Sequence, residues 1–128
     1  MQEPKFRSET REAIDSVAQK LNLPIEDWMQ DWAYIVANED QLKSYIDLYD
    51  RTVDDDEKFV LMQLIIQAAD LRKQENQLSD ADWQIIKQRL KTDFSIHEYT
   101  IFYWSQPEED IEFCFRITPE IRSVWEVE

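Results

Sequence analysis

The sequence contains no glycine, and this absence excludes several kinds of site. The dinucleotide-binding fingerprint and the P-loop both need glycine, because only a residue without a Cβ lets the backbone close on a phosphate group. The usual helix C-caps and two-residue hairpin turns are missing for the same reason. Asn22, Asn38 and Asn76 are the residues available for left-handed backbone positions. Nucleotide binding through either glycine-dependent motif is therefore excluded.

Cysteine and histidine are almost absent, with one residue of each, Cys114 and His97. A single cysteine cannot form an intramolecular disulfide, and a zinc site needs about four suitably spaced ligands. A Cys–His pair is possible in principle, but no flanking signature accompanies it, so we interpret His97 as a structural or surface residue. We therefore expect no catalytic residue, no metal and no cofactor, and a protein that is not an enzyme.

The chain also lacks a long hydrophobic run. Its longest apolar stretch, residues 59–69, is interrupted by Gln63 and Gln67 and is too short to span a membrane. Residues 1–7 have neither the apolar core nor the small-residue cleavage site of a signal peptide. Together with the single cysteine, these features predict a cytoplasmic protein.

The apolar material that the chain does contain is enough for one folded domain. Of its 128 residues, 43% are hydrophobic and 33% are charged. This length is typical of a single domain, and the hydrophobic content argues against global disorder. The sequence shows no internal repeat, low-complexity segment or linker. We predict one domain that covers residues 1–128.

Negative charge dominates the composition: 28 acidic residues face 14 basic ones, and the net charge is −14. Two segments hold the excess. Residues 26–57 carry eleven acids against two bases, and residues 98–128 carry eight acids against two bases. Nucleic acids and anionic lipid surfaces are themselves polyanions, so this charge argues against both as partners. It favours a cationic protein partner and a fast association that salt weakens.

Hydrophobic residues recur at helical spacing through the first two-thirds of the chain. Ser8 and Ser79 are the expected N-caps of the first and last of the helices that this spacing predicts. Pro24 fits the first turn of the second helix, and Asn38 is expected to end it. The five predicted helices span residues 9–21, 24–38, 39–49, 55–73 and 80–91.

The helix over residues 55–73 is apolar on nearly its whole circumference, which is typical of a central, buried helix. An acidic run, residues 54–57, precedes and opens it. The spacing and the glycine of an EF-hand loop are missing there, so a calcium site is not favoured. We interpret the run as negative charge that the helix dipole stabilises.

The last third of the chain has a different pattern. Residues 99–104 are aromatic and β-branched, which favours a strand, and residues 111–117 alternate with a period of two, which indicates a second strand. Residues 106–110 would form the turn, and Thr118 with Pro119 predicts a short last helix. The predicted fold is mainly α, a bundle of about five helices with a C-terminal aromatic β-hairpin and a short last helix. Because glycine is missing from the turn, an all-α fold is the alternative.

Aromatic and acidic residues meet at the proposed turn. The chain has five tryptophans, and Trp28, Trp32 and Trp83 lie on apolar helix stripes, so we expect them in the core. Aromatic residues beside an acidic rim have the composition of a binding hot spot. The alternative is a solvated turn next to core aromatics. The predicted partner-binding residues are Tyr103, Trp104, Glu108, Glu109, Asp110 and Glu112.

Three stretches carry a family resemblance: DDDEKFVLMQLIIQAAD (54–70), IHEYTIFYWS (96–105) and FRITPEIR (115–122). They resemble a pattern in small bacterial proteins whose size and acidity are similar to those of immunity proteins from polymorphic toxin and contact-dependent inhibition systems. The resemblance covers the C-terminal two-thirds of the chain and includes no catalytic signature. It implies a bacterial protein whose partner is encoded nearby, and it assigns no role to any single residue.

Charge, missing chemistry and resemblance together predict an inhibitor that binds and neutralises a cationic toxin, for example a nuclease. A nucleic-acid mimic that binds a DNA- or RNA-binding protein is the second hypothesis. The third is an enzyme that uses paired carboxylates with a divalent metal, and the fourth is a self-associating structural module. The sequence leaves the oligomeric state open.

Overall fold

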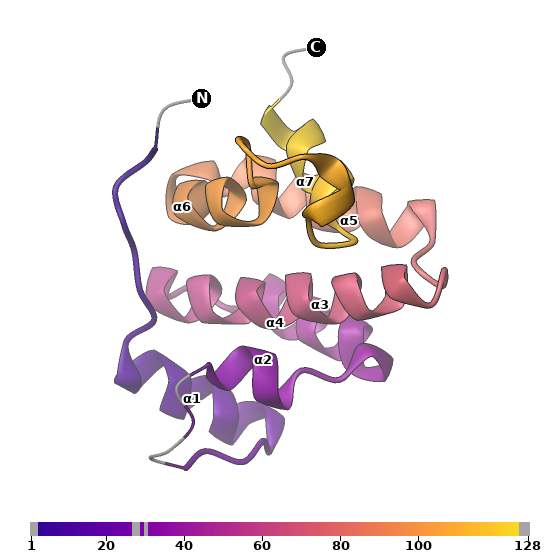
Figure 1. The fold of residues 1–128 in the computed structure, drawn as a ribbon. Helices are drawn as coiled ribbons and strands as arrows, with labels where there is room; N and C mark the ends of the chain where they lie inside the picture. Colours follow the sequence, from indigo (N-terminus) through magenta and orange to yellow (C-terminus); the bar gives the residue numbers. More distant parts are fainter. Residues whose placement is uncertain (1–2, 27–28, 30, 126–128) are drawn as a thin grey trace. The chain divides into compact units, whose positions relative to one another are not determined.

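The computed structural model describes residues 3–26, 29 and 31–125, and this part of the chain is all-α, with seven α-helices, two 3₁₀ turns and no strand. In the same residues no helix is both long and apolar enough to cross a membrane. The elements are α1 (Arg11–Leu21), α2 (Trp32–Val36), η1 (Glu39–Gln41), α3 (Leu42–Arg51), α4 (Asp55–Gln74), α5 (Asp80–Thr92), α6 (Phe94–Ser105), η2 (Ile111–Phe113) and α7 (Thr118–Trp125) (Figure 1). The mainly helical prediction is confirmed.

The chain forms two compact units. The N-terminal unit is Ser8–Ala68, and the C-terminal unit combines Met1–Arg7 with Ala69–Glu128. Helix α4 is continuous across the division, so its residues 55–68 belong to the first unit and its residues 69–74 to the second.

Helix α1 begins at a side-chain cap and ends at a left-handed residue. Thr10 Oγ1 accepts a hydrogen bond from the Ala13 N–H at 3.1 Å, so the predicted cap at Ser8 is wrong by two residues. Asn22 has a φ of 55° and ends the helix, as the absence of glycine led us to expect. Its buried face consists of Ala13, Val17 and Ala18.

Helix α2 is much shorter than the predicted helix over residues 24–38. Residues 23–26 are irregular, and Asn38 caps η1 by accepting a hydrogen bond from the Asp40 N–H, instead of ending α2. Trp32 is buried, and its indole N–H donates to the Pro24 carbonyl at 2.8 Å. A buried indole needs such an acceptor, and the irregular segment supplies it. Trp28, predicted in the core, lies outside the described residues.

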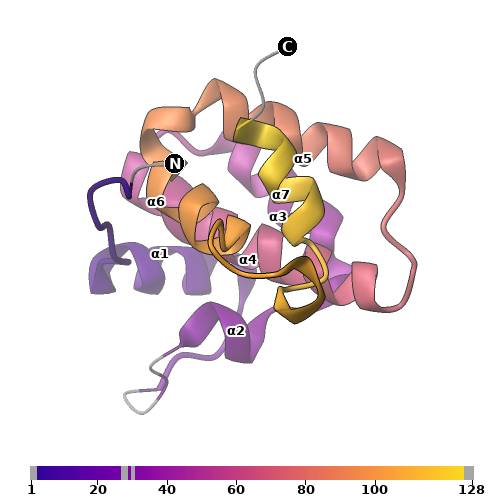
Figure 2. The same ribbon diagram turned by 45° about the horizontal axis from the view of Figure 1, so that its top comes forward.

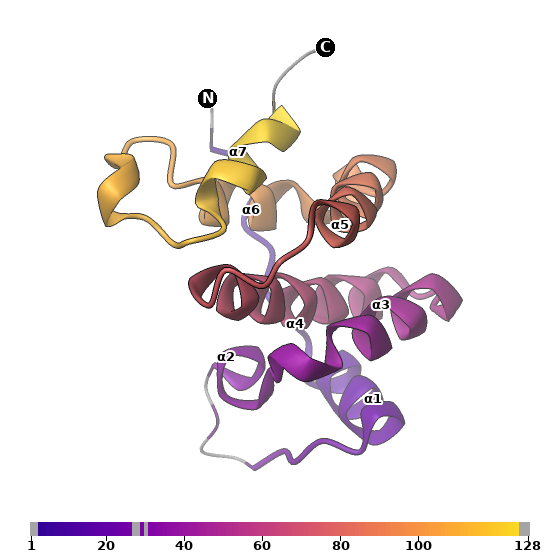
Figure 3. The ribbon, with the colours of Figure 1, turned by 90° about the vertical axis from the view of Figure 1, so that its right-hand side faces the viewer.

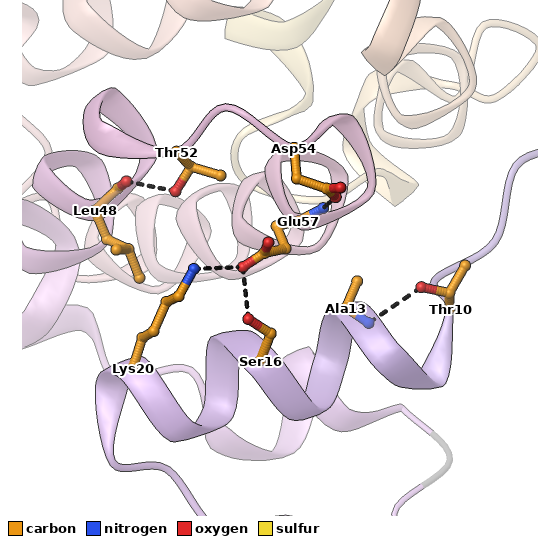
Figure 4. A network of polar contacts seen from close by, with 8 residues as sticks. All are labelled: Thr10, Ala13, Ser16, Lys20, Leu48, Thr52, Asp54 and Glu57. Atoms are coloured by element: carbon orange, nitrogen blue, oxygen red, sulfur yellow. Dashed lines mark hydrogen bonds and ion pairs between the residues drawn. The ribbon is translucent and has the colours of Figure 1, made fainter.

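The acidic run before α4 has a structural role (Figure 4). Asp54 Oδ1 accepts from the Glu57 N–H at 2.9 Å and caps the helix. Glu57 Oε1 accepts from Lys20 Nζ at 2.8 Å and from Ser16 Oγ at 2.7 Å, which ties α1 to the start of α4. These hydrogen bonds, the one from Lys20 first, hold the pKa of Glu57 below its ordinary value. The helix dipole and this network stabilise the run, in agreement with the sequence interpretation.

The other long helices follow the sequence pattern closely. Helix α4 buries nearly all of its apolar residues between Phe59 and Ala69, and α5 is capped by Ser79, whose Oγ accepts from the Asp82 N–H at 3.1 Å. In the C-terminal unit α5, α6 and α7 pack pairwise against one another (Figure 2). The extended segment at the N-terminus joins this unit, because the ring of Phe6 packs edge-on against that of Tyr99 on α6.

The predicted β-hairpin is wrong, and the all-α alternative is what the structure shows. Residues 99–104 lie within α6, where burial follows a helical period instead of alternating. Residues three and four positions apart share one face of a helix, and burying that face outweighs the β propensity of the side chains. The buried residues of α6 are Ile96, His97, Thr100, Ile101, Trp104 and Ser105.

Residues 111–117 consequently lack a strand to pair with. Ile117 is fully buried, and its N–H donates to the buried carboxylate of Asp70 at 2.9 Å instead of joining a ladder. Ile111 and Phe113, which would share one face of the predicted strand, are largely exposed. The turn η2 thus leaves two large apolar side chains in solvent.

We expect Asp54→Ala to lower the free energy of unfolding by about 1 kcal/mol, because it removes the N-cap of α4. Asp55→Ala is the matched control: it removes a neighbouring first-turn charge and is expected to change stability by only about 0.3 kcal/mol. Urea unfolding followed by circular dichroism measures both values. Equal losses in the two variants would show that the carboxylate charge matters and the cap does not.

The N-terminal unit also holds a carboxyl group with an unusual titration. Glu9 is largely buried, and its Oε2 lies without a hydrogen-bond partner among the described residues. Burial, and to a smaller extent the charge of Asp31, raises the pKa of Glu9 from 4.5 to about 7. The folded chain therefore keeps a proton that the unfolded chain releases, and this contribution to stability falls as the pH rises from 4.5 to about 7.

We expect Glu9→Gln to remove this pH dependence and to raise the free energy of unfolding at pH 8 by about 2 kcal/mol. Urea unfolding at pH 5 and pH 8 measures the change, with Glu12→Gln on the exposed face of α1 as the control. A stability difference between Glu9→Gln and the parent chain that is the same at both pH values would contradict the assignment.

Candidate functional site

Among the described residues of the C-terminal unit, the longest run of exposed residues joins α6 to α7. Every residue from Pro107 to Phe113 is exposed, and we call this segment the acidic edge. It contains four carboxylates and no lysine or arginine. It also exposes Ile111 and Phe113, which keep 50% and 68% of their surface in solvent. Figure 3 shows this connection extending away from α6 and α7. The acidic edge is a local concentration of negative charge and apolar surface.

The two apolar side chains of the acidic edge are energetically costly to expose. Covering a phenylalanine that is 68% exposed removes about 140 Å² from water, worth about 3 kcal/mol at the usual transfer coefficient. Contiguous exposed apolar patches with a polar rim mark interaction sites, and Ile111 and Phe113 lie two residues apart among the four carboxylates of the acidic edge. The geometry therefore favours a surface that is covered in a complex.

A groove adjoins the acidic edge within the same unit. It has a volume of about 490 Å³. The Phe102 ring supplies an apolar wall, and the carboxylates give the groove a negative potential. Among the described residues no lysine or arginine lines it, so no cation of the lining neutralises the carboxylates. Its lining consists of Glu3, Phe102, Gln106, Pro107, Glu108 and Glu109.

The backbone of the acidic edge is held by one side chain of α7, Arg122. Its guanidinium donates to three carbonyl oxygens: Nε to Ser105 at 2.7 Å, and Nη2 to Gln106 at 2.7 Å and to Glu109 at 2.9 Å. The first two carbonyls lie at the C-terminal end of α6, where helical carbonyls have no partner within the helix and where a cation is favoured by the dipole. Arg122 therefore fixes both the end of α6 and the start of the acidic edge.

Further hydrogen bonds close the connection. The Cys114 thiol lies 3.3 Å from the Asp110 carbonyl oxygen, to which it donates, and 3.6 Å from Nη2 of Arg122. The Phe115 N–H donates to Oε1 of Gln106 at 3.3 Å, and Gln106 itself occupies a left-handed position with a φ of 40°. An exposed segment that is fixed in this way loses little conformational freedom when a partner binds.

The structure separates the predicted binding residues into two groups. Trp104 is only 6% exposed, and its ring packs on Phe115 at a centroid distance of 4.4 Å, so it supports the surface from below. Tyr103 is half-exposed and contacts the same Phe115 ring at 5.9 Å. The four predicted carboxylates are exposed on the acidic edge: Glu108, Glu109, Asp110 and Glu112.

Sequence reasoning missed several residues of this surface. Ile111 and Phe113 could have been found from the helical spacing of residues 96–105, because a helix there leaves 111–117 without a strand partner. Phe102 lies one helical turn before Gln106, so the same helical spacing would have placed it there. Glu3 and Arg122 have no comparable signal, since only the tertiary fold brings them to residues 106–109.

The residues considered for chemistry are placed elsewhere. His97 is fully buried within α6, and Cys114 is partly buried in the connection that Arg122 holds. Within residues 3–26, 29 and 31–125, no group of three or more His, Cys, Asp or Glu side chains is arranged as metal ligands would be. The predicted absence of a metal and of a cofactor stays a prediction.

Comparison with known proteins gives no match: no family model, no curated protein and no solved structure matches the chain. Function is therefore inferred from the residues and their geometry.

We expect Arg122→Met to loosen the acidic edge, because three carbonyls lose their donor, and to lower the free energy of unfolding by about 2 kcal/mol. Hydrogen exchange at the Glu109, Phe113 and Cys114 amides should quicken about tenfold or more, while exchange in α1 stays unchanged. Arg116→Met, which removes an exposed arginine from the same unit, is the control. Unchanged exchange at these amides would show that Arg122 does not hold the segment.

Proposed function

We propose that this chain is an inhibitor that binds and neutralises a cationic toxin domain, as immunity proteins do. The acidic edge is the observation that carries the proposal: four carboxylates and two exposed apolar side chains on a backbone that Arg122 holds in place. The resemblance of residues 54–70, 96–105 and 115–122 to small acidic bacterial proteins supports the same function.

The charge of the chain suits the capture of a cationic protein. A net charge of −14 attracts a basic partner over distances of about the Debye length and raises the association rate. Steered association reaches about 10⁸–10⁹ M⁻¹s⁻¹ at low salt, which matters when a toxin has to be stopped before it acts. Apolar contacts that become buried afterwards slow the dissociation of the complex.

A nuclease is the toxin class that this surface suits best. Nucleases hold their substrates through cationic residues that contact phosphates. Carboxylates on an exposed, fixed segment can occupy such a cleft or bind beside it, and the apolar residues between them add affinity that nucleic acid does not provide. Inhibition then needs no catalytic group on this chain.

The test is a co-purification. The chain is expressed with the C-terminal region of the protein encoded immediately upstream, and calorimetry at two salt concentrations measures the affinity. We expect a dissociation constant of about 10 nM or lower that rises with salt. The absence of a complex would contradict the immunity function. Binding to several unrelated DNA-binding proteins, each displaced by DNA, would establish a nucleic-acid mimic instead.

Charge reversal distinguishes the role of the acidic residues 108–110 from that of the acidic residues 54–56. We expect Glu108→Lys, Glu109→Lys and Asp110→Lys together to weaken the complex about 100-fold or more and to leave the melting temperature within about 2 °C. The matched triple reversal at residues 54–56 removes the cap of α4, so it should lower the melting temperature and change affinity much less. The opposite pattern would place the binding face in the N-terminal unit.

A further inference from the structure

We infer that the acidic edge and the groove together dock one cationic amphipathic segment of a partner protein. An apolar side chain of that segment packs on Ile111 and Phe113, and an arginine or lysine of the same segment enters the groove beside Phe102. This inference rests on the proposed function and deepens it by naming the chemistry of the partner's contact segment.

The groove and the acidic edge are parts of one surface. Pro107, Glu108 and Glu109 belong to both, since they line the groove and also open the exposed segment. A ligand that lies along residues 107–113 therefore reaches the groove at one end and the exposed apolar side chains of η2 at the other. Because the two parts are continuous, one partner segment that carries both an apolar and a cationic side chain can contact both of them.

The groove has the chemistry that a long cationic side chain needs. Its volume of about 490 Å³ lies within the usual range of about 300–1,000 Å³ for ligand clefts. The methylene stem of an arginine or lysine can lie on the Phe102 ring, which also attracts the charge through its π face. The carboxylates of Glu3, Glu108 and Glu109 then accept hydrogen bonds from the charged head, and such bonds are among the strongest in proteins.

Charge excludes the other occupants of an exposed apolar surface. A second copy of the chain would bring the same four carboxylates against this face, and each copy carries a net charge of −14. Nucleic acid and anionic lipid would be repelled in the same way. A neutral apolar helix would cover Ile111 and Phe113 only by leaving the carboxylates around them desolvated and unpaired. A segment with both apolar and cationic side chains covers Ile111 and Phe113 and also pairs with the carboxylates around them.

The first experiment titrates the full, isotopically labelled chain with a synthetic peptide and follows amide chemical shifts by NMR. The probe is a capped fifteen-residue amphipathic helix of leucine, alanine and arginine. Its control is the same peptide with citrulline in place of each arginine, which keeps the shape and removes the charge. We expect shifts confined to residues 3, 102–115 and 122, and binding at least tenfold weaker for the citrulline peptide. Shifts centred elsewhere, or equal affinity for both peptides, would overturn the inference.

Two variants then test the two halves of the surface. Phe113→Ser should weaken binding of the arginine peptide about 30-fold, and the double variant E108Q/E109Q should weaken it about tenfold. Val53→Ser removes an apolar side chain that is even more exposed, from the N-terminal unit, and E75Q/E98Q removes two exposed carboxylates outside the surface. Neither control should change affinity more than twofold. Controls as damaging as the test variants would show that general charge or apolarity, and not this surface, binds the peptide.

The same variants distinguish failure of the inference from failure of the proposed function. If the cognate complex forms and both Phe113→Ser and E108Q/E109Q keep its affinity, the docking surface is wrong and the inhibitor function stands. If no cognate complex forms but the peptide binds at this surface, the inference stands and the immunity function fails. A dimer in sedimentation that Phe113→Ser dissociates would overturn the inference in favour of a second copy.

Discussion

The hydrogen bonds of Arg122 meet a constraint that every helix C-terminus imposes, since its last carbonyls have no partner within the helix. Helix α6 ends at Ser105, and the following Gln106 takes the left-handed position usually given to glycine. The carbonyls at this end of the helix need donors from outside the helix. The Arg122 guanidinium supplies them and extends its contacts to Glu109. Gln106 also makes a contact that glycine could not make, because its side-chain oxygen accepts a hydrogen bond from the Phe115 N–H. The conformation of the acidic edge depends on this arrangement.

The fold could be predicted from sequence where caps and stripes agreed. The sequence indicated three helices that the chain forms: α3 from its apolar stripe, α4 from its apolar circumference, and α5 from its N-cap, Ser79. Prediction failed where local conformational propensity and long-range packing favoured different structures. The aromatic and β-branched side chains of α6 favour strands locally, but their helical spacing buries one face. The irregular segment before α2 places the Pro24 carbonyl at a tryptophan eight residues away, which no local pattern encodes.

The candidate surface was predictable only in its charge. Glu108 to Asp110 are recognisable as an exposed acidic run from sequence alone. Phe113 is exposed because residues 99–104 form a helix and leave residues 111–117 without a strand partner, so the predicted hairpin gave no indication of this exposure. Glu3 and Arg122 come from opposite ends of the chain, and only packing onto α6 brings them to the same connection. Residues of this kind carry no signal before the tertiary structure is known.

The continuity of helix α4 across both units limits how this protein can exchange parts during evolution. Domain boundaries usually fall in flexible linkers, where whole modules can be exchanged by recombination. Here the division between the two units falls at Ala68 and Ala69, inside one unbroken helix. Neither unit can be transplanted without splitting that helix, and helix formation is cooperative along its length. Under the proposed function, we therefore expect a change of partner specificity to come from single substitutions within the exposed connection and not from exchange of one half of the chain.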